Sequence, residues 1–348
     1  MLLVLAMGAA LWGIGRLMGA PRAARAYMLG LLYVAVLMVH LVLPAGHPLR
    51  VATGGTAALW LVLGGFVALG LGYAWVLRRV KGRAEAVEAE RAPAEAPGTY
   101  AEGELDRYAR HIVLRELGGP GQTRLKKARV LVVGAGGLGS PALLYLAGAG
   151  VGTIGVIDDD VVSVTNLQRQ VIHRDADIDM PKVFSAQKAM LALNPHVTVK
   201  PYKRKLTDEI AGDLLADYDL VLDGTDNFET RYLVNRAAVA RGIPLVSGAL
   251  SQWEGQLSVF DPAHGAPCYA CIFPQAPAAG LAPSCAEAGV LGPLPGIVGA
   301  MMAAEAVKVI AGAGQPLRGE MLIHDALWGE TRKIALTRRE GCPVCGGG

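Results

Sequence analysis

The chain has 348 residues, of which 52% are hydrophobic, with 33 basic and 30 acidic side chains. This length accommodates one sizeable globular domain and a further segment. Eight basic side chains and no acidic one fall in residues 1–83, which leaves 25 basic and 30 acidic side chains in residues 84–348. Because this second part is mildly acidic and has no run of Lys or Arg with interleaved aromatic residues, nucleic acid is not expected as a partner.

Residues 1–80 have the composition of a membrane anchor with two to three transmembrane helices. Tyr27–Pro44 and Thr56–Leu77 contain no Asp, Glu, Lys or Arg. As helices they would reach roughly 27 and 33 Å, enough for a hydrocarbon core of about 30 Å. Met1–Ala20 is a third candidate, interrupted by Arg16. A cleaved signal peptide is the alternative there, but Met1–Met7 lacks the usual positive start.

Basic residues in the loops predict the orientation of these spans. Two arginines in the first loop and four basic residues in 78–83 outnumber the single arginine of the second loop. Since positive loops stay on the cytoplasmic side, the N-terminus is expected outside and everything after residue 77 in the cytoplasm. The prediction is a multi-pass protein of the inner (cytoplasmic) membrane. Residues 81–98, rich in Ala, Glu, Arg and Pro, are expected to be a linker.

Residues 99–348 alternate helical stretches and short apolar runs, the pattern of a doubly wound, Rossmann-like α/β domain with a mostly parallel sheet. One helix is expected at 103–117, with Leu105, Tyr108, Ala109 and Ile112 on one face, and another at 181–195. The expected parallel strands are 129–134, 153–158, 197–202, 218–226 and 243–248.

After residue 250 the pattern changes to a C-terminal antiparallel extension. Its expected strands, 254–260, 319–327 and 330–339, surround one long apolar helix at 293–312. That helix has the length of a further membrane span. Glu305 and Lys308 within it favour a buried or dimer-packing helix instead.

A glycine-rich turn follows the first expected strand. Gly134, Gly136 and Gly139 have the spacing G-x-G-x-x-G, which lets backbone N–H groups approach a phosphate at a helix N-terminus. Asp158 ends the next strand, 24 residues after Gly134, where a carboxylate meets ribose hydroxyls. The pattern predicts a nucleotide site but does not separate NAD from ATP.

Polar and charged residues further along favour ATP over NAD. Asn166, Arg169 and Gln170 follow the ribose acid, and Lys182 begins a helix. Two cations that converge on one cleft suit a triphosphate, whose charge builds up when pyrophosphate leaves. Asp226 comes at the end of a strand, where its carboxylate is placed to hold Mg²⁺.

The chain contains five cysteines. Cys268 and Cys271 form one C-x-x-C pair, and Cys342 and Cys345 form another, which predicts a structural zinc site of four thiolates. Redox pairs are the rival interpretation, and no thioredoxin-type context accompanies these cysteines. Cys285 stands apart in residues 274–289, either as a nucleophile that receives an acyl group from an adenylate or as a thiol without a role.

Together these motifs resemble the MoeB/ThiF/HesA family, the sulfur-carrier relatives of ubiquitin-activating enzymes. The matching stretches include "RYARHIVLREL", "GAGGLG", "NLQRQ", "MPK", "LDGTDN", "CYAC", "SCAEAGVLGP" and "GCPVCGG", in family order between about Glu104 and Gly347. The resemblance implies a homodimer that uses MgATP to adenylate the C-terminal Gly-Gly carboxylate of a small ubiquitin-like protein, with release of pyrophosphate.

The resemblance also implies roles for individual residues. It assigns to the nucleotide site Gly134, Gly136, Gly137, Gly139, Asp158, Asp160, Thr165, Asn166, Leu167, Gln168, Arg169, Lys182, Asp226 and Asn227. Arg169 and Lys182 would neutralise phosphate charge, and Asp226 would bind Mg²⁺. Arg110 would reach into the partner subunit's site as a phosphate finger. Cys285 matches a loop cysteine implicated in thioester or persulfide chemistry, and Cys268, Cys271, Cys342 and Cys345 match the zinc ligands.

The expected carrier is the molybdopterin synthase small subunit, with the thiamine-pathway carrier as the alternative. A non-catalytic, membrane-tethered nucleotide-binding scaffold is the alternative of another class. The sequence after the last cysteine pair holds no rhodanese-like domain, so a separate sulfur donor such as a cysteine desulfurase is expected. The resemblance does not explain the membrane segment, because the family core is normally soluble.

Overall fold

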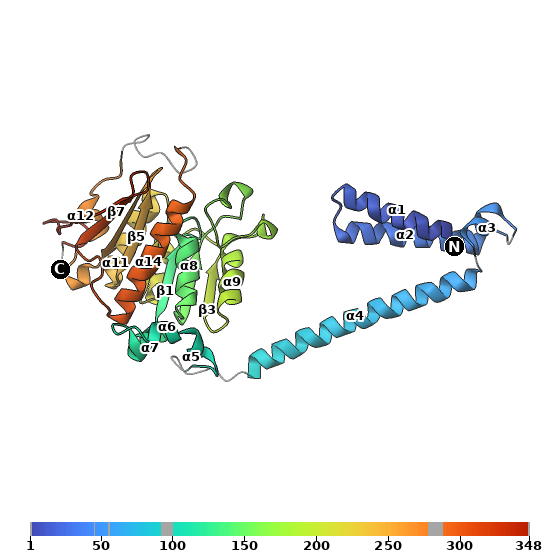
Figure 1. Ribbon diagram of the computed structural model, residues 1–348, viewed down its shortest axis with the longest axis horizontal. Coiled ribbons are helices and arrows are strands. Elements are labelled where there is room, and N and C mark those ends of the chain that lie inside the picture. Colours follow the sequence, from blue (N-terminus) through green and yellow to red (C-terminus); the bar gives the residue numbers. More distant parts are fainter. Residues whose placement is uncertain (1, 45, 55, 92–99, 278–287, 347–348) are drawn as a thin grey trace. The chain divides into compact units, whose positions relative to one another are not determined.

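The computed structural model describes residues 2–44, 46–54, 56–91, 100–277 and 288–346 (Figure 1). The chain forms two compact units, Met1–Ala94 and Glu95–Gly348. The first unit is helical, and the second combines helices with one large sheet.

Helices make up the first unit: α1 (Leu2–Leu17), α2 (Arg22–Val42), α3 (Pro48–Thr53) and α4 (Ala57–Arg91). Val4, Val36 and Trp60 form a small buried cluster between α1, α2 and α4. His40 is buried beside it and lies 2.9 Å from the Thr53 hydroxyl through its Nε2 atom. Many of the other large apolar side chains of α1, α2 and α4 are exposed.

The three expected spans coincide with α1, α2 and the first part of α4. By length and hydropathy alone, two of the described helices could cross a membrane, Ala23–Val42 and Pro293–Ala311. The apolar parts of α1 and α4, Leu3–Leu17 and Ala57–Gly70, are shorter. Since α4 continues to Arg91, residues 81–91 of the expected linker are helical. The membrane anchor stays a prediction.

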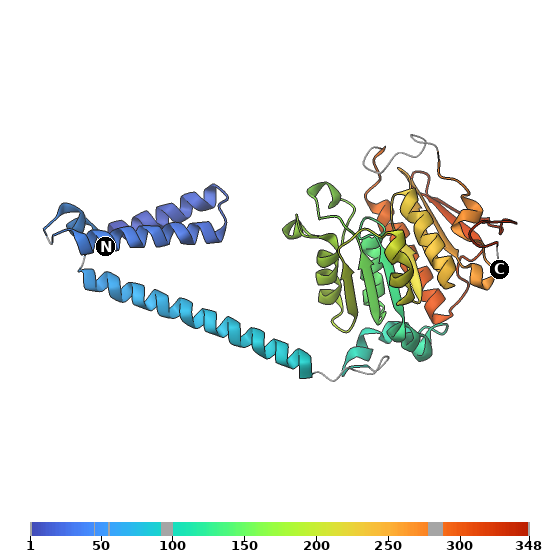
Figure 2. The same cartoon turned by 180° about the vertical axis from the view of Figure 1, so that it is seen from behind.

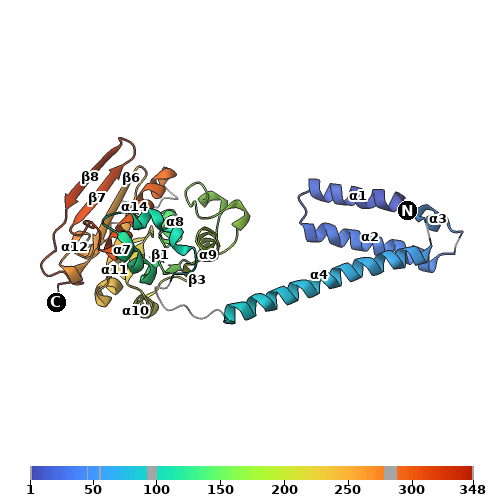
Figure 3. The same cartoon turned by 60° about the horizontal axis from the view of Figure 1, so that its bottom comes forward.

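One eight-stranded sheet organises the second unit. Its strands are β1 (Arg129–Val133), β2 (Thr153–Ile157), β3 (Thr198–Tyr202), β4 (Leu220–Asp223), β5 (Leu245–Leu250), β6 (Glu254–Phe260), β7 (Glu320–Asp325) and β8 (Glu330–Ala335). Their order is β3-β2-β1-β4-β5-β6-β7-β8, so that β3 and β8 lie at opposite edges (Figure 3). The first five are parallel, and β6 to β8 are antiparallel. The predicted parallel core and antiparallel extension are confirmed.

Helices cover both faces of the sheet (Figures 1 and 2). On one face lie α7 (Gly118–Lys127), α8 (Gly139–Gly148), α9 (Lys182–Leu193) and α14 (Pro293–Ala311), and on the other α10 (Asp208–Ala216) and α11 (Phe228–Arg241). Val130 and Val132 of β1 belong to the core under α8, whereas Leu131 and Val133 belong to the core under α11. Successive residues of a strand point to opposite faces of the sheet. A strand that is covered by helices on both faces is therefore an uninterrupted run of apolar residues.

The remaining short elements are α5 (Glu104–Arg107), α6 (Ala109–Ile112), η1 (Val164–Asn166), η2 (Asp175–Asp177), η3 (Pro262–His264) and α12 (Tyr269–Ile272). Among the helices, α14 is a core helix rather than a membrane span, as expected. Leu294, Val298 and Met302 are buried. Gly299 brings α14 close to the first turn of α8, since a Cβ there would lie 2.3 Å from the Leu138 carbonyl oxygen.

The single helix predicted over 103–117 is wrong. The structure has α5 and α6 instead, with Tyr108 between them. The Tyr108 ring is buried against Gly150, and its hydroxyl accepts a 2.8 Å hydrogen bond from Asn194 Nδ2. These contacts interrupt the helix at Tyr108, and Leu105 of the expected apolar face is 47% exposed.

Candidate nucleotide site and cysteine cluster

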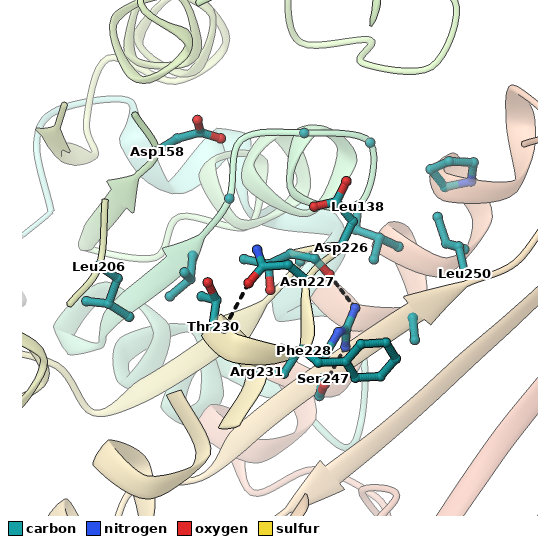
Figure 4. A pocket seen from close by; sticks show the side chains of 18 of the residues that line it. Leu138, Asp158, Leu206, Asp226, Asn227, Phe228, Thr230, Arg231, Ser247 and Leu250 are labelled. Carbon is teal, nitrogen blue, oxygen red and sulfur yellow. Dashed lines mark hydrogen bonds between the residues drawn. The ribbon is translucent and has the colours of Figure 1, made fainter. Parts of the chain in front are cut away.

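A pocket of about 440 Å³ lies at the carboxyl ends of the parallel strands. Its lining reaches from Asp158 and Leu206, which follow β2 and β3, to Leu250 at the end of β5 (Figure 4). In the sheet, β1 lies between β2 and β4: the chain continues from β1 to β2 on one side of β1, and β4 pairs with β1 on its other side. Such a reversal of strand order is where doubly wound sheets bind their ligands, and the volume is that of a small-molecule site.

Most of the predicted nucleotide residues line this pocket. They are Gly134, Gly136, Gly137, Asp158, Asp160, Arg169, Lys182, Asp226 and Asn227. Gly139 is the first residue of α8, directly behind the turn. Thr165, Asn166, Leu167 and Gln168 lie on or just after η1 and are not part of the lining. Cys285 lies outside the described residues.

The glycine turn fits closely against its surroundings. Gly134 has a φ of 94°, and a Cβ on Gly139 would lie 1.9 Å from the Gly134 carbonyl oxygen. Within the described part of the chain, no acceptor lies against the N–H groups of Gly136 and Gly137. Unpaired N–H groups before a helix bind anions well, because the helix dipole adds to their positive charge.

Asp158 braces this turn from the end of β2. Its Oδ2 atom accepts a 2.8 Å hydrogen bond from the Ala135 N–H, and its Oδ1 atom accepts a 2.9 Å bond from the Asp160 N–H. Burial raises the pKa of Asp158, while the charge of Lys182 and these two bonds act in the opposite direction. Each carboxylate oxygen has a second lone-pair site, so Asp158 can also accept from a ribose.

Two cations approach the turn from the segment between β2 and α9. Lys182 is buried, and its Nζ atom lies 2.7 Å from Oδ2 of the exposed Asp160. Arg169 donates to the Thr165 carbonyl at 3.2 Å and to Asn166 Oδ1 at 3.3 Å. Thr165 and Asn166 therefore orient Arg169, although they do not line the pocket themselves.

Asp226 and Asn227 follow β4 at the next strand end. Asn227 caps α11, because its Oδ1 atom accepts a 2.9 Å hydrogen bond from the Thr230 N–H (Figure 4). Asp226 is exposed at the pocket. A solvent-facing carboxylate at a phosphate site suits Mg²⁺, which prefers oxygen ligands and keeps several waters.

Sequence reasoning missed three further cations in the lining, Arg204, Lys205 and Arg231. Arg204 and Lys205 come directly after β3, so the basic run at a strand end was an available signal. Gln170 also lines the pocket, and its buried Oε1 atom has no hydrogen-bond partner among the described residues. A polar ligand would satisfy that atom.

The four paired cysteines come together in one buried cluster, against which Val239 of α11 packs. Sγ of Cys268 lies 3.8 Å from Sγ of Cys271 and 3.7 Å from Sγ of Cys342, and Cys271 and Cys345 are 3.4 Å apart. Tetrahedral zinc with bonds of about 2.3 Å would place its sulfurs about 3.8 Å apart. All four side chains are buried, so these residues fit a structural zinc ion.

Without a metal the four thiols do not ionise alike. Burial raises the pKa of Cys268 and Cys345, whereas the backbone N–H groups of Cys345 and Val344 help to lower the pKa of Cys342 against the effect of burial. A bound metal ion would favour the thiolate form of all four.

Arg110 does not line the pocket of its own chain. It is exposed on α6, next to α7, whose end at Lys127 precedes the first residue of β1. Arg110 therefore comes from the amino edge of the sheet, whereas the pocket is at the carboxyl edge.

Comparison with known proteins agrees with this geometry. The ThiF family model matches residues 108–344. The sulfur carrier protein adenylyltransferase of Thermus thermophilus is 54% identical over 247 residues, which cover 70% of this chain and 91% of that protein. The molybdopterin-synthase adenylyltransferase of Salmonella typhimurium is 46% identical over 243 residues, 70% of this chain and 97% of the relative.

Among solved structures, E. coli MccB with MccA-N7isoASN superposes with a TM-score of 0.61 at 23% identity, covering 69% of this chain and 75% of that chain. This likeness concerns the fold alone. With the family model spanning residues 108–344 and two relatives matched over nine-tenths or more of their own length, the chain belongs to the ThiF family.

Proposed function

We propose that this chain adenylates the C-terminal Gly-Gly carboxylate of a ubiquitin-like sulfur-carrier protein, with MgATP as co-substrate. The observation that carries the proposal is the pocket itself, where a glycine turn with unpaired N–H groups meets Asp158, Lys182 and Arg169. Relatives named as adenylyltransferases of sulfur carriers support it.

The reaction needs charge neutralisation more than proton transfer. A carboxylate oxygen of the carrier attacks the α-phosphorus and forms the new O–P bond, while the bond to the β-phosphate oxygen breaks and pyrophosphate leaves with the electron pair. No general base is needed, because a C-terminal carboxylate is already ionised at neutral pH. The turn's N–H groups position the phosphates, and Lys182 and Arg169 offset the developing charge.

Magnesium is part of this proposal. The exposed carboxylate of Asp226 would hold the ion at the pocket, and bound Mg²⁺ would neutralise phosphate charge. Asn227 already caps α11, so its side chain fixes the position of the loop that carries Asp226.

The pocket also suits the end of a carrier protein. Its lining also includes Leu250, Ser251, Gln256 and Pro295. Two terminal glycines have no side chains, so they would need little room beside these residues to reach the α-phosphate. We propose the molybdopterin synthase small subunit as the carrier, with the thiamine-pathway carrier as the alternative, and a separate protein as the sulfur donor.

A homodimer is the proposed assembly. Arg110 is exposed and outside its own pocket, so it is available to the pocket of a second copy. Exposed apolar side chains would be available to such a partner, among them Val113 at 74%, Val164 at 64% and Val171 at 60% exposure.

The first unit is proposed to anchor the enzyme in the inner membrane, with residues 95–348 in the cytoplasm. The outward-facing apolar side chains of α1, α2 and α4 support this. A topology reporter fused after residue 83 should give the signal of a cytoplasmic location. A periplasmic signal would reverse the orientation.

ATP–pyrophosphate exchange by the full chain in membranes tests the activity, with each candidate carrier added in turn. Exchange should require one carrier and should vanish when that carrier lacks its last two glycines. If no candidate carrier supports exchange, the non-catalytic scaffold is favoured, and tight NAD binding that ATP does not disturb would favour a dehydrogenase. Cys285→Ser should keep exchange, and a loss of the later sulfur transfer would identify Cys285 as a nucleophile.

A further inference from the structure

We infer that His173 is a positioning residue of the nucleotide site, which holds the Ala135 carbonyl so that the Gly136 N–H faces the phosphates of ATP. This inference rests on the proposed function, because it assigns a nucleotide phosphate to the glycine turn. His173 lies in the segment between β2 and α9 and does not line the pocket.

His173 is buried in a chain of polar contacts beneath the turn. Its Nε2 atom lies 2.9 Å from the Ala135 carbonyl oxygen, and its Nδ1 atom lies 2.9 Å from Ser185 Oγ. Ser185 Oγ is 3.1 Å from Oδ2 of Asp177, whose Oδ1 accepts a 2.7 Å bond from Lys188 Nζ. These contacts fix the ring from both sides.

The partners determine where the ring carries its proton. A carbonyl oxygen can only accept, so Nε2 must donate to Ala135. In the neutral ring, Nδ1 then carries no proton, so the single hydroxyl proton of Ser185 is shared between Nδ1 and Oδ2 of Asp177. Burial lowers the pKa of His173, and the positive charge of Lys182 lowers it further. The hydrogen bond to Ala135 and the charges of Asp158 and Asp177 oppose this effect without reversing it. The neutral ring with its proton on Nε2 is therefore the form at pH 7.

The Ala135 carbonyl controls a group that does line the pocket. The carbonyl of Ala135 and the N–H of Gly136 belong to one planar trans peptide, so they point in opposite directions. His173 holds the carbonyl on the buried side, which leaves the Gly136 N–H toward the pocket. The preceding peptide is held in the same way, since Asp158 accepts from the Ala135 N–H. Two consecutive peptides of the turn are thus fixed by side chains.

Loss of the His173 contact would free this peptide to rotate. A rotated peptide presents its carbonyl oxygen to the phosphates, where it repels them. The penalty should fall on ligands with phosphates and spare the nucleoside. A histidine that merely fills the core would instead affect both ligands together.

The experiment compares ATP with adenosine on the full chain, by calorimetric titration in detergent. His173→Leu has similar size but no donor, and should weaken ATP binding about tenfold, which is about 1.4 kcal/mol, with adenosine binding unchanged. His173→Gln carries an amide N–H at a reach close to that of Nε2. Its affinity for ATP should therefore stay within about threefold of that of the unchanged chain, a smaller loss than one tenfold step of about 1.4 kcal/mol. His324→Leu is the matched control, because His324 contacts the Thr331 hydroxyl at 2.9 Å on the β7–β8 hairpin.

The inference is overturned if His173→Leu weakens the binding of ATP and of adenosine equally. It is also overturned if His173→Leu binds ATP as tightly as the unchanged chain does. If His173→Leu does not unfold cooperatively, His173→Asn replaces it. Its shorter amide cannot reach Ala135, so an ATP-specific loss is again expected, and its absence refutes the role. If the protein without any substitution binds adenosine but not ATP, that result counts against the proposed function instead.

Discussion

Nη1 of Arg231 lies 3.6 Å from Oδ2 of Asp223, and the two side chains are only 6% and 1% exposed. Ser247 Oγ lies within reach of both, at 3.3 Å from the guanidinium and 3.4 Å from the carboxylate. Arg231 also donates to the Thr225 carbonyl. This buried pair therefore fixes the segment between β4 and α11 that brings Asp226 to the pocket.

Removing one partner should destabilise the second unit strongly. Asp223→Ala leaves the Arg231 charge buried without its partner, which typically costs about 3–5 kcal/mol. The exposed pair Arg129–Asp219 is the control, since it is closer, at 2.7 Å, but both side chains are 47% exposed. Asp219→Ala should cost about 1 kcal/mol or less. Denaturant unfolding measures both, and equal losses would show that burial does not decide the outcome.

Lys182 should be required for the chemical step. Its buried ammonium group faces the phosphate site, so Lys182→Met removes charge stabilisation worth about 10²- to 10³-fold in kcat for a single donor. Pyrophosphate exchange is the measurement. Lys333→Met on β8 is the control, because Lys333 contacts Glu320 at 2.8 Å and does not line the pocket. Comparable losses in both variants would contradict the assignment.

Metal analysis of the reduced full chain should find one zinc ion per chain. Cys345→Ser should reduce that content and lower the unfolding midpoint, because the ion contributes folding free energy. Cys285→Ser should retain the metal, because Cys268, Cys271, Cys342 and Cys345 already supply the four thiolates of a tetrahedral site. Reduced protein without metal would refute the four-thiolate site.

Acid should weaken the packing around α5. Burial alone would raise the pKa of Glu104, but contacts with Lys126, the Ala101 N–H and Tyr108 lower it below its usual 4.5. The folded state then binds fewer protons than the unfolded state, so this contribution is complete above pH of about 4.5 and is lost as the pH falls through the folded pKa.

Unfolding midpoints measured between pH 7 and pH 3 test this linkage. Glu104→Gln should flatten the acid limb of the curve, and Lys126→Met, which removes the partner 2.7 Å away, should do the same. If the acid limb keeps its slope in Glu104→Gln, another carboxylate is responsible.

The sequence predicted those parts of the site that depend on local order along the chain. Parallel strands with buried faces are uninterrupted apolar runs, and their carboxyl ends meet at one edge. Asp158, Lys182 and Asp226 were therefore expected together. The cysteine cluster is also predictable from the sequence, because the spacing of each cysteine pair is that of metal-binding turns.

What the sequence did not reveal depends on partners far along the chain. Arg231 is on α11, and its burial depends on Asp223 and Ser247 from two strands. Tyr108 interrupts a helical pattern through contacts with Gly150 and Asn194. No local periodicity reports such contacts.

The cysteine cluster has a consequence for the order in which the site is completed. Cys268 is followed by Tyr269, whose ring lines the nucleotide pocket, and the cluster joins it to Cys342 across 74 residues. During synthesis the glycine turn leaves the ribosome early, whereas the contact between Cys268 and Cys342 forms only after the second cysteine pair has emerged. A nascent chain can thus form its phosphate turn well before the cysteine cluster joins the segment of Tyr269 to the C-terminal residues.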